Sequence, residues 1–425
     1  MMFRLRVGCL AGLLFLGLGG EAVWGQSPSG GVYSGLRTWT TVEGRSFQAS
    51  LLGGDGAQVI LRLPNGESGS VAIQRLSAAD QAFVRGALGE KRGAAGGGPV
   101  LGKREWPTKV EVDSSAIDVK FVSEASGEKQ YVYHSKSFEF EAQDKLAGTV
   151  MREVARTFEA TRALMEALPW GIQPSPPAKP GYYRAKLYEN RENYIRDGGP
   201  VYSGGVYFRK DRMFRIPFQS LGLELRGKTW FKNERFQNDT LVHEVTHQMM
   251  HDFLPFLPTW MIEGTAEYAA MLPYHAGRFS TDAHERGIKE YIRAYQERTK
   301  GSVADMISPL ELMNMTSEGW HQRSDKGGRE QSRLYFSSCL LVYFFCHLDG
   351  DGKGGGFLSY FDQIREAKWA WAEFFKKPEV RWNPDGSYTY PSNLTPPSQA
   401  YEEAYGRELG AILVKGRDSA ALKQA

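Results

Sequence analysis

Two histidines and a glutamate between Asn238 and His247 have the residue types and spacing of a metal site. His243 and His247 are four residues apart, so a helix would place both imidazoles on one face, one turn apart. Two imidazoles placed in this way can bind one Zn²⁺ ion. Glu244 follows the first histidine and can accept a proton from water on that metal. Taken alone, the pattern also fits two histidines on a polar helix face.

The segment from Trp260 to Tyr268 contains two more carboxylates at helical spacing. A zinc site with two histidines needs a third protein ligand and an open position for water, and Glu263 is the candidate for that ligand. Glu267, one turn later, is placed to accept the other ring N–H of a ligating histidine. The alternative is a solvated acidic helix face. The apolar residues that flank both glutamates favour a packed helix instead.

The motif H-E-x-x-H followed by W-x-x-E-G-x-A-E-Y resembles the gluzincin branch of zinc metallopeptidases. It is similar to a group of bacterial secreted proteins that share a domain of unknown function. The resemblance implies that His243, His247 and Glu263 are zinc ligands, that Glu244 is the general base, and that Glu267 supports a histidine. Fifteen residues separate His247 from Glu263, fewer than in aminopeptidase gluzincins, so the substrate class stays open.

Further residues are candidates for the surroundings of the metal. Gluzincins often carry a tyrosine in the region of Tyr335, which implies that Tyr335 stabilises the oxyanion of the reaction, with His321 as the alternative. His251 shares the face of the two histidines but lacks metzincin spacing, so we expect a structural or rim position. Zincin-type enzymes hold peptides along a sheet edge, and residues 203–208 are the candidate edge, with a plain hairpin as the alternative.

The expected order of elements is α+β, with the sheet first and the helices after it. Strand-like runs are expected at 110–122, 131–140 and 183–188, and a hairpin at 205–216. Helices are expected at about 143–168, 190–196 and 331–347, and the chain is mainly helical from 238 onward. Cys339 and Cys346, seven residues apart on one helix, are too far apart for a disulfide and should be buried free thiols.

A separate small β module is expected at 37–86. Alternating apolar residues and turn signals there suit a five-stranded SH3-like barrel. The stretch resembles the SLA-one homology module, with an R-x-W opening at Arg37 and Trp39 and a closing L-S-x-x-D from Leu76 to Asp80. The glycine-rich stretch 87–105 is expected to be a flexible linker. The metallopeptidase-like domain is expected to span 106–415.

Residues 1–25 are predicted to be a signal peptide, with Arg4 and Arg6 before an apolar run and small residues at its exit. The chain would then be exported, periplasmic or extracellular, with no stable membrane span after cleavage. The net charge of +3 is close to zero, which disfavours nucleic acid as a partner.

The sequence therefore predicts zinc-dependent hydrolysis of peptide bonds. His243, His247 and Glu263 would hold Zn²⁺, Glu244 would remove a proton from the attacking water, and Tyr335 would stabilise the oxyanion. The expected partners are a peptide or protein substrate and a protein that binds the barrel. Two alternatives are a non-catalytic binding protein on a zincin scaffold and an amide hydrolase acting on cell-wall peptides.

Overall fold

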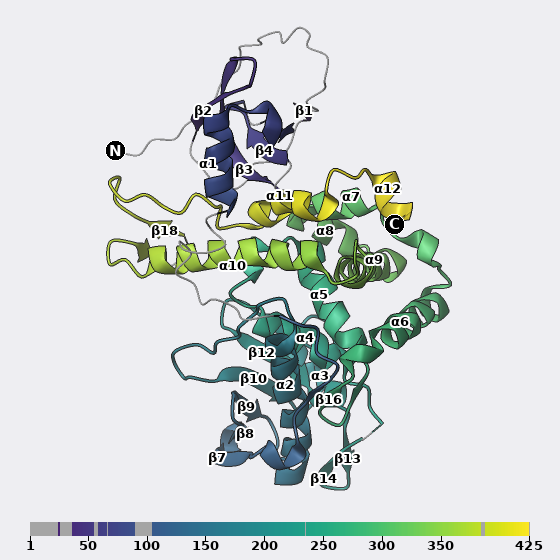
Figure 1. Ribbon diagram of the computed structural model, residues 1–425. Helices are drawn as coiled ribbons and strands as arrows, with labels where there is room; N and C mark the ends of the chain where they lie inside the picture. Colours follow the sequence, from purple (N-terminus) through teal and green to yellow (C-terminus); the bar gives the residue numbers. More distant parts are fainter. Residues whose placement is uncertain are drawn as a thin grey trace. The chain divides into compact units, whose positions relative to one another are not determined.

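The computed structural model describes residues 24–25, 36–54, 58–65, 67–89, 104–233, 235–383 and 387–424 (Figure 1). Contacts divide the chain into two compact units, the first ending at Arg92 and the second running from Gly93 to the C-terminus. Helices make up 46% and strands 20%, a mixture consistent with the predicted α+β class. Among the described residues, no helix is both long and apolar enough to cross a bilayer.

The first unit is built on a five-stranded antiparallel sheet followed by a helix. Its strand order is β1–β5–β4–β3–β2, and the elements are β1 (Trp24–Gly25), β2 (Arg37–Thr40), β3 (Ser46–Gly54), β4 (Gln58–Arg62), β5 (Ser68–Ala72) and α1 (Ala78–Gly89). The alternating residues of β3 and β4 are fully buried around Trp39: Ala49, Leu51, Val59 and Leu61. The alternating apolar residues predicted in these strands therefore form the core of this unit.

The R-x-W opening and the L-S-x-x-D close of this module meet in space. An Arg37 Nη atom lies 2.7 Å from Asp80 Oδ1, and the other Asp80 carboxylate oxygen accepts the backbone N–H of Thr40 at 2.7 Å. The Ser77 hydroxyl accepts the backbone N–H of Asp80 at 3.2 Å, which caps α1. Asp80 is 3% exposed, so a buried, fully paired carboxylate ties the helix to the sheet.

The linker is shorter at both ends than predicted. Residues 87–89 form the last turn of α1, because Ala87 and Leu88 are good helix formers. Arg104 already packs on the second unit, where it bonds the Pro169 carbonyl at 3.0 Å and the Asp362 carboxylate at 2.7 Å. The stretch between, 90–103, lies outside the described residues. So does the predicted signal peptide, except that Trp24 and Gly25 pair with β5 as strand β1.

The second unit contains a six-stranded mixed sheet in the order β11–β12–β10–β9–β8–β7. Strands β9, β10 and β12 are parallel, whereas β11 is antiparallel to β12 and forms one edge. The strands are β7 (Lys120–Ala125), β8 (Gln130–His134), β9 (Phe138–Ala142), β10 (Tyr183–Tyr188), β11 (Val206–Phe208) and β12 (Met213–Pro217). The strand at 183–188 and the hairpin at 205–216 are confirmed.

Two expected strands are broken by turns. Only β6 (Val110–Glu111) and the start of β7 fall in the run 110–122, because Asp113 accepts the Ser115 N–H at 2.7 Å in an intervening turn. The run 131–140 is divided between β8 and β9, where the Glu159 carboxylate accepts the Ser137 N–H at 2.7 Å. A local side chain competes with the sheet for the backbone at the first point. At the second, the competing carboxylate is 22 residues away in the sequence.

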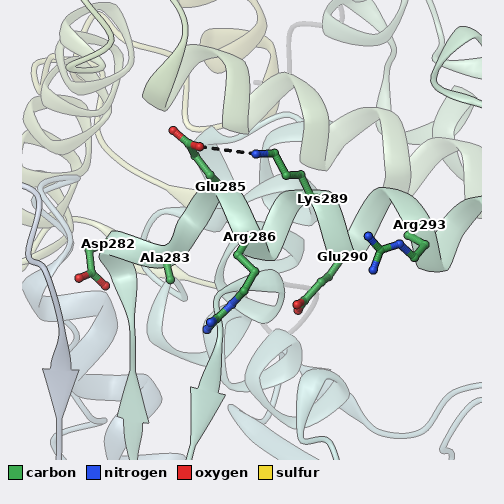
Figure 2. A pocket seen from close by; sticks show the side chains of 7 residues that line it. All are labelled: Asp282, Ala283, Glu285, Arg286, Lys289, Glu290 and Arg293. Carbon is green, nitrogen blue, oxygen red and sulfur yellow. Dashed lines mark ion pairs between the residues drawn. The ribbon is translucent and has the colours of Figure 1, made fainter.

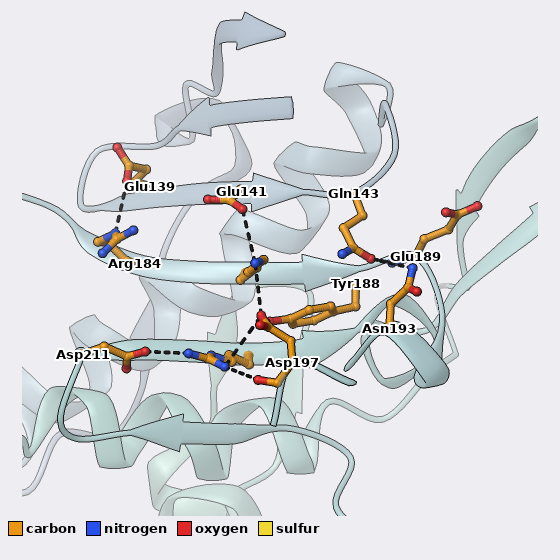
Figure 3. Close-up of polar contacts among 11 residues, drawn as sticks. Glu139, Glu141, Gln143, Arg184, Tyr188, Glu189, Asn193, Asp197 and Asp211 are labelled. Atoms are coloured by element: carbon orange, nitrogen blue, oxygen red, sulfur yellow. Dashed lines mark hydrogen bonds and ion pairs between the residues drawn. The ribbon is translucent and has the colours of Figure 1, made fainter. Parts of the chain in front are cut away.

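The sheet has one apolar and one charged face. Helices α2 (Gly148–Ala167) and α4 (Asp239–Met249) pack on the apolar face, whose buried residues include Phe138, Phe140, Ala185, Leu187 and Phe214. On the other face, ion pairs join β9 to β10 (Figure 3): Glu139 with Arg184, and Glu141 with Lys186. Arg215 of β12 pairs with Asp211 of the preceding hairpin turn on the same face. The two longer helices therefore pack on the apolar face, and α4 lies there beside the edge strand β11.

The rest of the unit is mainly helical, as predicted. Three short antiparallel sheets join it: β15 (Tyr274–His275) and β16 (Arg278–Phe279) with β6, β13 (Leu223–Arg226) with β14 (Thr229–Lys232), and β17 (Arg381–Trp382) with β18 (Tyr388–Thr389). Its helices are α3 (Arg191–Arg196), α5 (Thr259–Met271), α6 (His284–Thr299), α7 (Pro309–Asn314), α8 (Ser317–Ser324), α9 (Gly328–His347), α10 (Gly355–Phe375), α11 (Glu403–Val414) and α12 (Ser419–Gln424). Cys339 and Cys346 of α9 are buried free thiols, as predicted.

Candidate metal centre

Helices α4 and α5 hold the five residues selected from the sequence. The apolar residues Leu241, Val242, Val245 and Met249 are buried and fix the rotation of α4 about its axis. Asn238, whose residue type is common at helix N-caps, makes no capping bond, and its side-chain oxygen instead accepts a hydrogen bond from Lys232 Nζ at 3.0 Å. Helix α5 begins directly after Pro258. Proline has no backbone N–H to donate, so it separates α5 from the turn that precedes it.

Three donor atoms converge between the two helices. The Nε2 atoms of His243 and His247 lie 3.0 Å apart. Glu263 Oε2 lies 3.2 Å from the first of these atoms and 3.4 Å from the second. Tetrahedral zinc with ligand bonds of about 2.0–2.1 Å requires donor atoms about 3.3 Å apart. The three measured separations bracket that value.

The chemistry of these donors also fits a cation. Two imidazole nitrogens and a carboxylate oxygen present lone pairs to the same point, which is unfavourable unless positive charge lies between them. Burial disfavours protonated His243, but the two carboxylates that contact it outweigh burial and raise its pKa well above the usual value. Among the described residues, His243, His247 and Glu263 are the one group of three or more side chains that meets the geometric requirement for a shared ion.

Glu267 lies behind His243, on the side away from the donor atoms. Its Oε1 is 3.0 Å from His243 Nδ1, so it accepts that ring N–H and leaves Nε2 free as a ligand. Tyr291 of α6 donates to the Glu267 carboxylate in turn. Burial opposes ionisation of Glu267, but the bond to His243 outweighs it and lowers the pKa of this carboxyl. The Nδ1 atom of His247, by contrast, is buried without a hydrogen-bond partner among the described residues.

Glu244 is oriented by the edge strand of the sheet. Its Oε2 accepts the backbone N–H of Tyr207 in β11 at 2.9 Å. Burial raises the pKa of Glu244 despite the nearby imidazoles, and a raised pKa makes the carboxylate a stronger base. The bond also shows that the N–H of Tyr207 points away from β12 and toward α4.

The group lies in a large cleft of about 2120 Å³. Its walls include the loop and strand at 200–207, the helices α4, α5 and α6, and the start of α9. The cleft is larger than the roughly 300–1,000 Å³ typical of small-molecule sites. It is therefore large enough for an extended chain molecule.

Tyr335 of α9 faces the metal centre across this cleft. Its ring centroid is 6.1 Å from that of His243, and the ring of Trp320 packs on it at 5.9 Å. The negative charge of Glu263, followed by burial, raises the pKa of Tyr335 well above the usual value. The phenol is therefore neutral and able to donate a hydrogen bond near the donor atoms.

The two other histidines considered from the sequence lie outside the donor group. His251 is bonded through Nδ1 to the Tyr207 hydroxyl at 2.8 Å, and burial followed by Arg212 lowers its pKa to about 4. His321 lines the cleft but is exposed, with Nδ1 2.6 Å from the Ser317 carbonyl oxygen. His251 therefore has the structural position expected of it, beside the edge strand.

Gly264 brings α9 close to α5. A Cβ at this position would lie 2.6 Å from the Ser338 carbonyl oxygen and 2.8 Å from Val342 Cγ2. The close approach places Tyr335, one turn before Ser338, over the metal centre. Three contacts could not be predicted from the sequence: Gly264 with α9, Tyr207 with Glu244, and Tyr291 with Glu267. Each of them joins elements that are far apart in the chain.

A smaller hollow of about 500 Å³ lies along α6 (Figure 2). Its lining is mostly charged, and Glu285 and Lys289 form an ion pair there at 3.7 Å. The charges of both signs lie along one helix face without converging on a point. This surface has the character of a solvated helix face, so the cleft with the converging donors is the candidate site.

No model of a known protein family matches the chain, and no curated protein is significantly similar to it in sequence. The assignment of a function therefore depends on the geometry and chemistry of the site.

Proposed function

We propose that the second unit is a zinc-dependent peptidase with a zincin-like fold and a gluzincin-like ligand set. The observation that carries the proposal is the convergence of His243, His247 and Glu263, whose donor atoms are 3.0–3.4 Å apart. Two imidazoles and one carboxylate are the ligands of many catalytic zinc sites, which keep a further position open. When bound, the metal would supply Lewis acidity and lower the pKa of water toward neutrality.

The remaining groups have matching roles. Glu244, held by the Tyr207 N–H, takes the proton of the attacking water and later delivers it to the leaving amine. Glu267 fixes the tautomer and ring orientation of His243. Tyr335 donates a hydrogen bond to the oxyanion that develops on the attacked carbonyl. All three act from positions already set by hydrogen bonds or packing.

The edge strand β11 supports an extended polypeptide as the substrate. Its partner β12 lies on one side, and the Tyr207 N–H on the other side points to Glu244 in the cleft. A peptide lying along this edge would bring its backbone beside the metal centre, in the manner of strand addition. The cleft volume of about 2120 Å³ also favours a chain over a compact metabolite.

We further propose that the first unit is an SH3-like SLA-one homology module that binds a protein partner. The meeting of Arg37 with Asp80 around buried Trp39 supports this proposal. Export through the N-terminal segment is part of the same proposal, and a tagged chain followed by cell fractionation tests it.

Digestion of a mixed peptide library tests the peptidase proposal, with and without a chelator. We expect new termini in the wild-type digest, loss of cleavage with the chelator, and recovery after zinc is added. Glu290→Gln is a matched control, since Glu290 lines the cleft but is not in the donor group, and this variant should cleave normally. Bound zinc with no turnover of any peptide would instead favour a binding protein.

A further inference from the structure

The loop 199–204, which precedes β11, carries three exposed apolar residues in succession. Val201 is 53% exposed and Tyr202 is 98% exposed, and both line the cleft together with Pro200. Single exposed apolar residues are common on protein surfaces. Three in succession at the wall of the cleft that holds the metal centre are less easily explained by chance exposure.

Hydrogen bonds hold this loop in one conformation. The Arg191 guanidinium of α3 donates to the carbonyl oxygens of Val201 and Ser203, the latter at 3.2 Å. The Tyr194 hydroxyl lies 2.5 Å from Ser203 Oγ, and the Tyr194 ring fills the space that a side chain at Gly199 would need. The exposed side chains are therefore mounted on a fixed backbone, which lowers the entropy lost when a ligand binds them.

The end of the loop lies close to α4, the helix that carries His243 and His247. A Cβ on Gly204 would lie 3.0 Å from Thr240 Cγ2, in the first turn of α4, one turn before His243. Farther along β11, the Tyr207 N–H bonds Glu244. A strand rises at most about 3.4 Å per residue, so the five steps from Tyr202 to Tyr207 span at most about 17 Å. A substrate along β11 would reach Tyr202 within about five residues of the reacting bond.

We infer that Pro200, Val201 and Tyr202 form a subsite for an apolar, preferably aromatic, side chain of an extended polypeptide substrate. The subsite lies toward the N-terminal end of β11 and is distinct from the metal ligands and the base. Tyrosine suits such a contact, because it buries a large rigid surface with few rotatable bonds. The inference rests on the proposed peptidase function and adds the substrate preference of that site.

Cleavage of paired peptides by Tyr202→Ala tests the inference. Each pair differs by phenylalanine or serine at one position within five residues of the bond cut by the wild type. We expect the wild type to prefer phenylalanine at one such position, and the variant to lose about tenfold in kcat/KM for that peptide only. Phe231→Ala is the matched control, since Phe231 is an exposed aromatic (44%) outside the cleft lining, and it should keep the preference.

The outcomes separate the subsite from the reaction. Unchanged preference in Tyr202→Ala overturns the subsite and leaves the peptidase proposal standing. If the wild type cuts no peptide, the peptidase proposal fails, and fluorescence anisotropy decides the subsite with labelled extended peptides that differ by phenylalanine or serine at one position. Weaker binding of the phenylalanine peptide to Tyr202→Ala then supports it, and equal binding overturns it.

Discussion

The contact between Glu267 and His243 should set a measurable part of the metal affinity. Glu267 Oε1 is 3.0 Å from His243 Nδ1, and the Glu267 side chain is 20% exposed, so water screens the contact little. Removing such a partner of a metal-binding histidine costs about 10–100-fold in affinity, or about 1.4–2.7 kcal/mol. Glu267→Ala should therefore raise the zinc Kd by about that factor.

Glutamine at the same position gives a graded result. Its amide oxygen can still accept the Nδ1–H, but the negative charge is gone, and a neutral bond is about half as strong as a charge-assisted one. We expect Glu267→Gln to raise the Kd by about 3–10-fold, between the wild type and Glu267→Ala.

Competition with a chromophoric zinc chelator measures these constants directly. Glu290→Gln, an acid of the same cleft outside the donor group, should leave the Kd unchanged and controls for the loss of one negative charge. The reasoning is refuted if Glu267→Ala binds zinc within about twofold of the wild type while remaining folded.

Two further predictions concern stability. Gly264→Ala would place a Cβ only 2.6 Å from the Ser338 carbonyl oxygen, so it should lower the free energy of unfolding by about 1–3 kcal/mol in urea titrations. Gly355→Ala is the control, since a Cβ there meets nothing within 4 Å and should leave this free energy unchanged. Equal urea midpoints for the two variants would contradict the close approach of α9 to α5. Burial, followed by charge repulsion from His284, lowers the pKa of His347 to about 3. A histidine in an unfolded chain has a pKa of ~6.5. The unfolded state therefore binds this proton first, and the free energy of unfolding should fall below about pH 6.5, by at most ~1.4 kcal/mol per pH unit, down to about pH 3. The free energy of unfolding of His347→Gln should fall by about 2 kcal/mol less than that of the wild type between about pH 7 and pH 5. An equal fall in the two proteins would contradict the assignment.

The metal ligands could be selected from the sequence because their geometry is largely local. Residues four apart on a helix share a face whatever the rest of the fold does, so His243 with His247, and Glu263 with Glu267, needed only helix formation. The β10 strand and the β11–β12 hairpin were also predictable from apolar runs and turn residues.

Contacts between distant elements could not be predicted in this way. The Tyr207 N–H that holds Glu244 depends on how β11 lies against α4, and a backbone donor leaves no trace in residue type. In the sequence Gly264 is only a weak helix former, and its close contact with α9 depends on how two distant helices pack. The strand errors at 110–122 and 131–140 have a related cause, since Asp113 and Glu159 bond the backbone and end strands that apolar periodicity would continue.

Zinc content and peptide cleavage, measured together on the wild type and Glu244→Gln, test the central claim most directly. Glu244 is outside the donor group and is held by the Tyr207 N–H, so its replacement should spare the metal and remove the base. We predict about one zinc ion per chain in both proteins and cleavage by the wild type alone. Cleavage by Glu244→Gln at the wild-type rate, or a wild-type protein that cleaves peptides without binding zinc, would contradict the account.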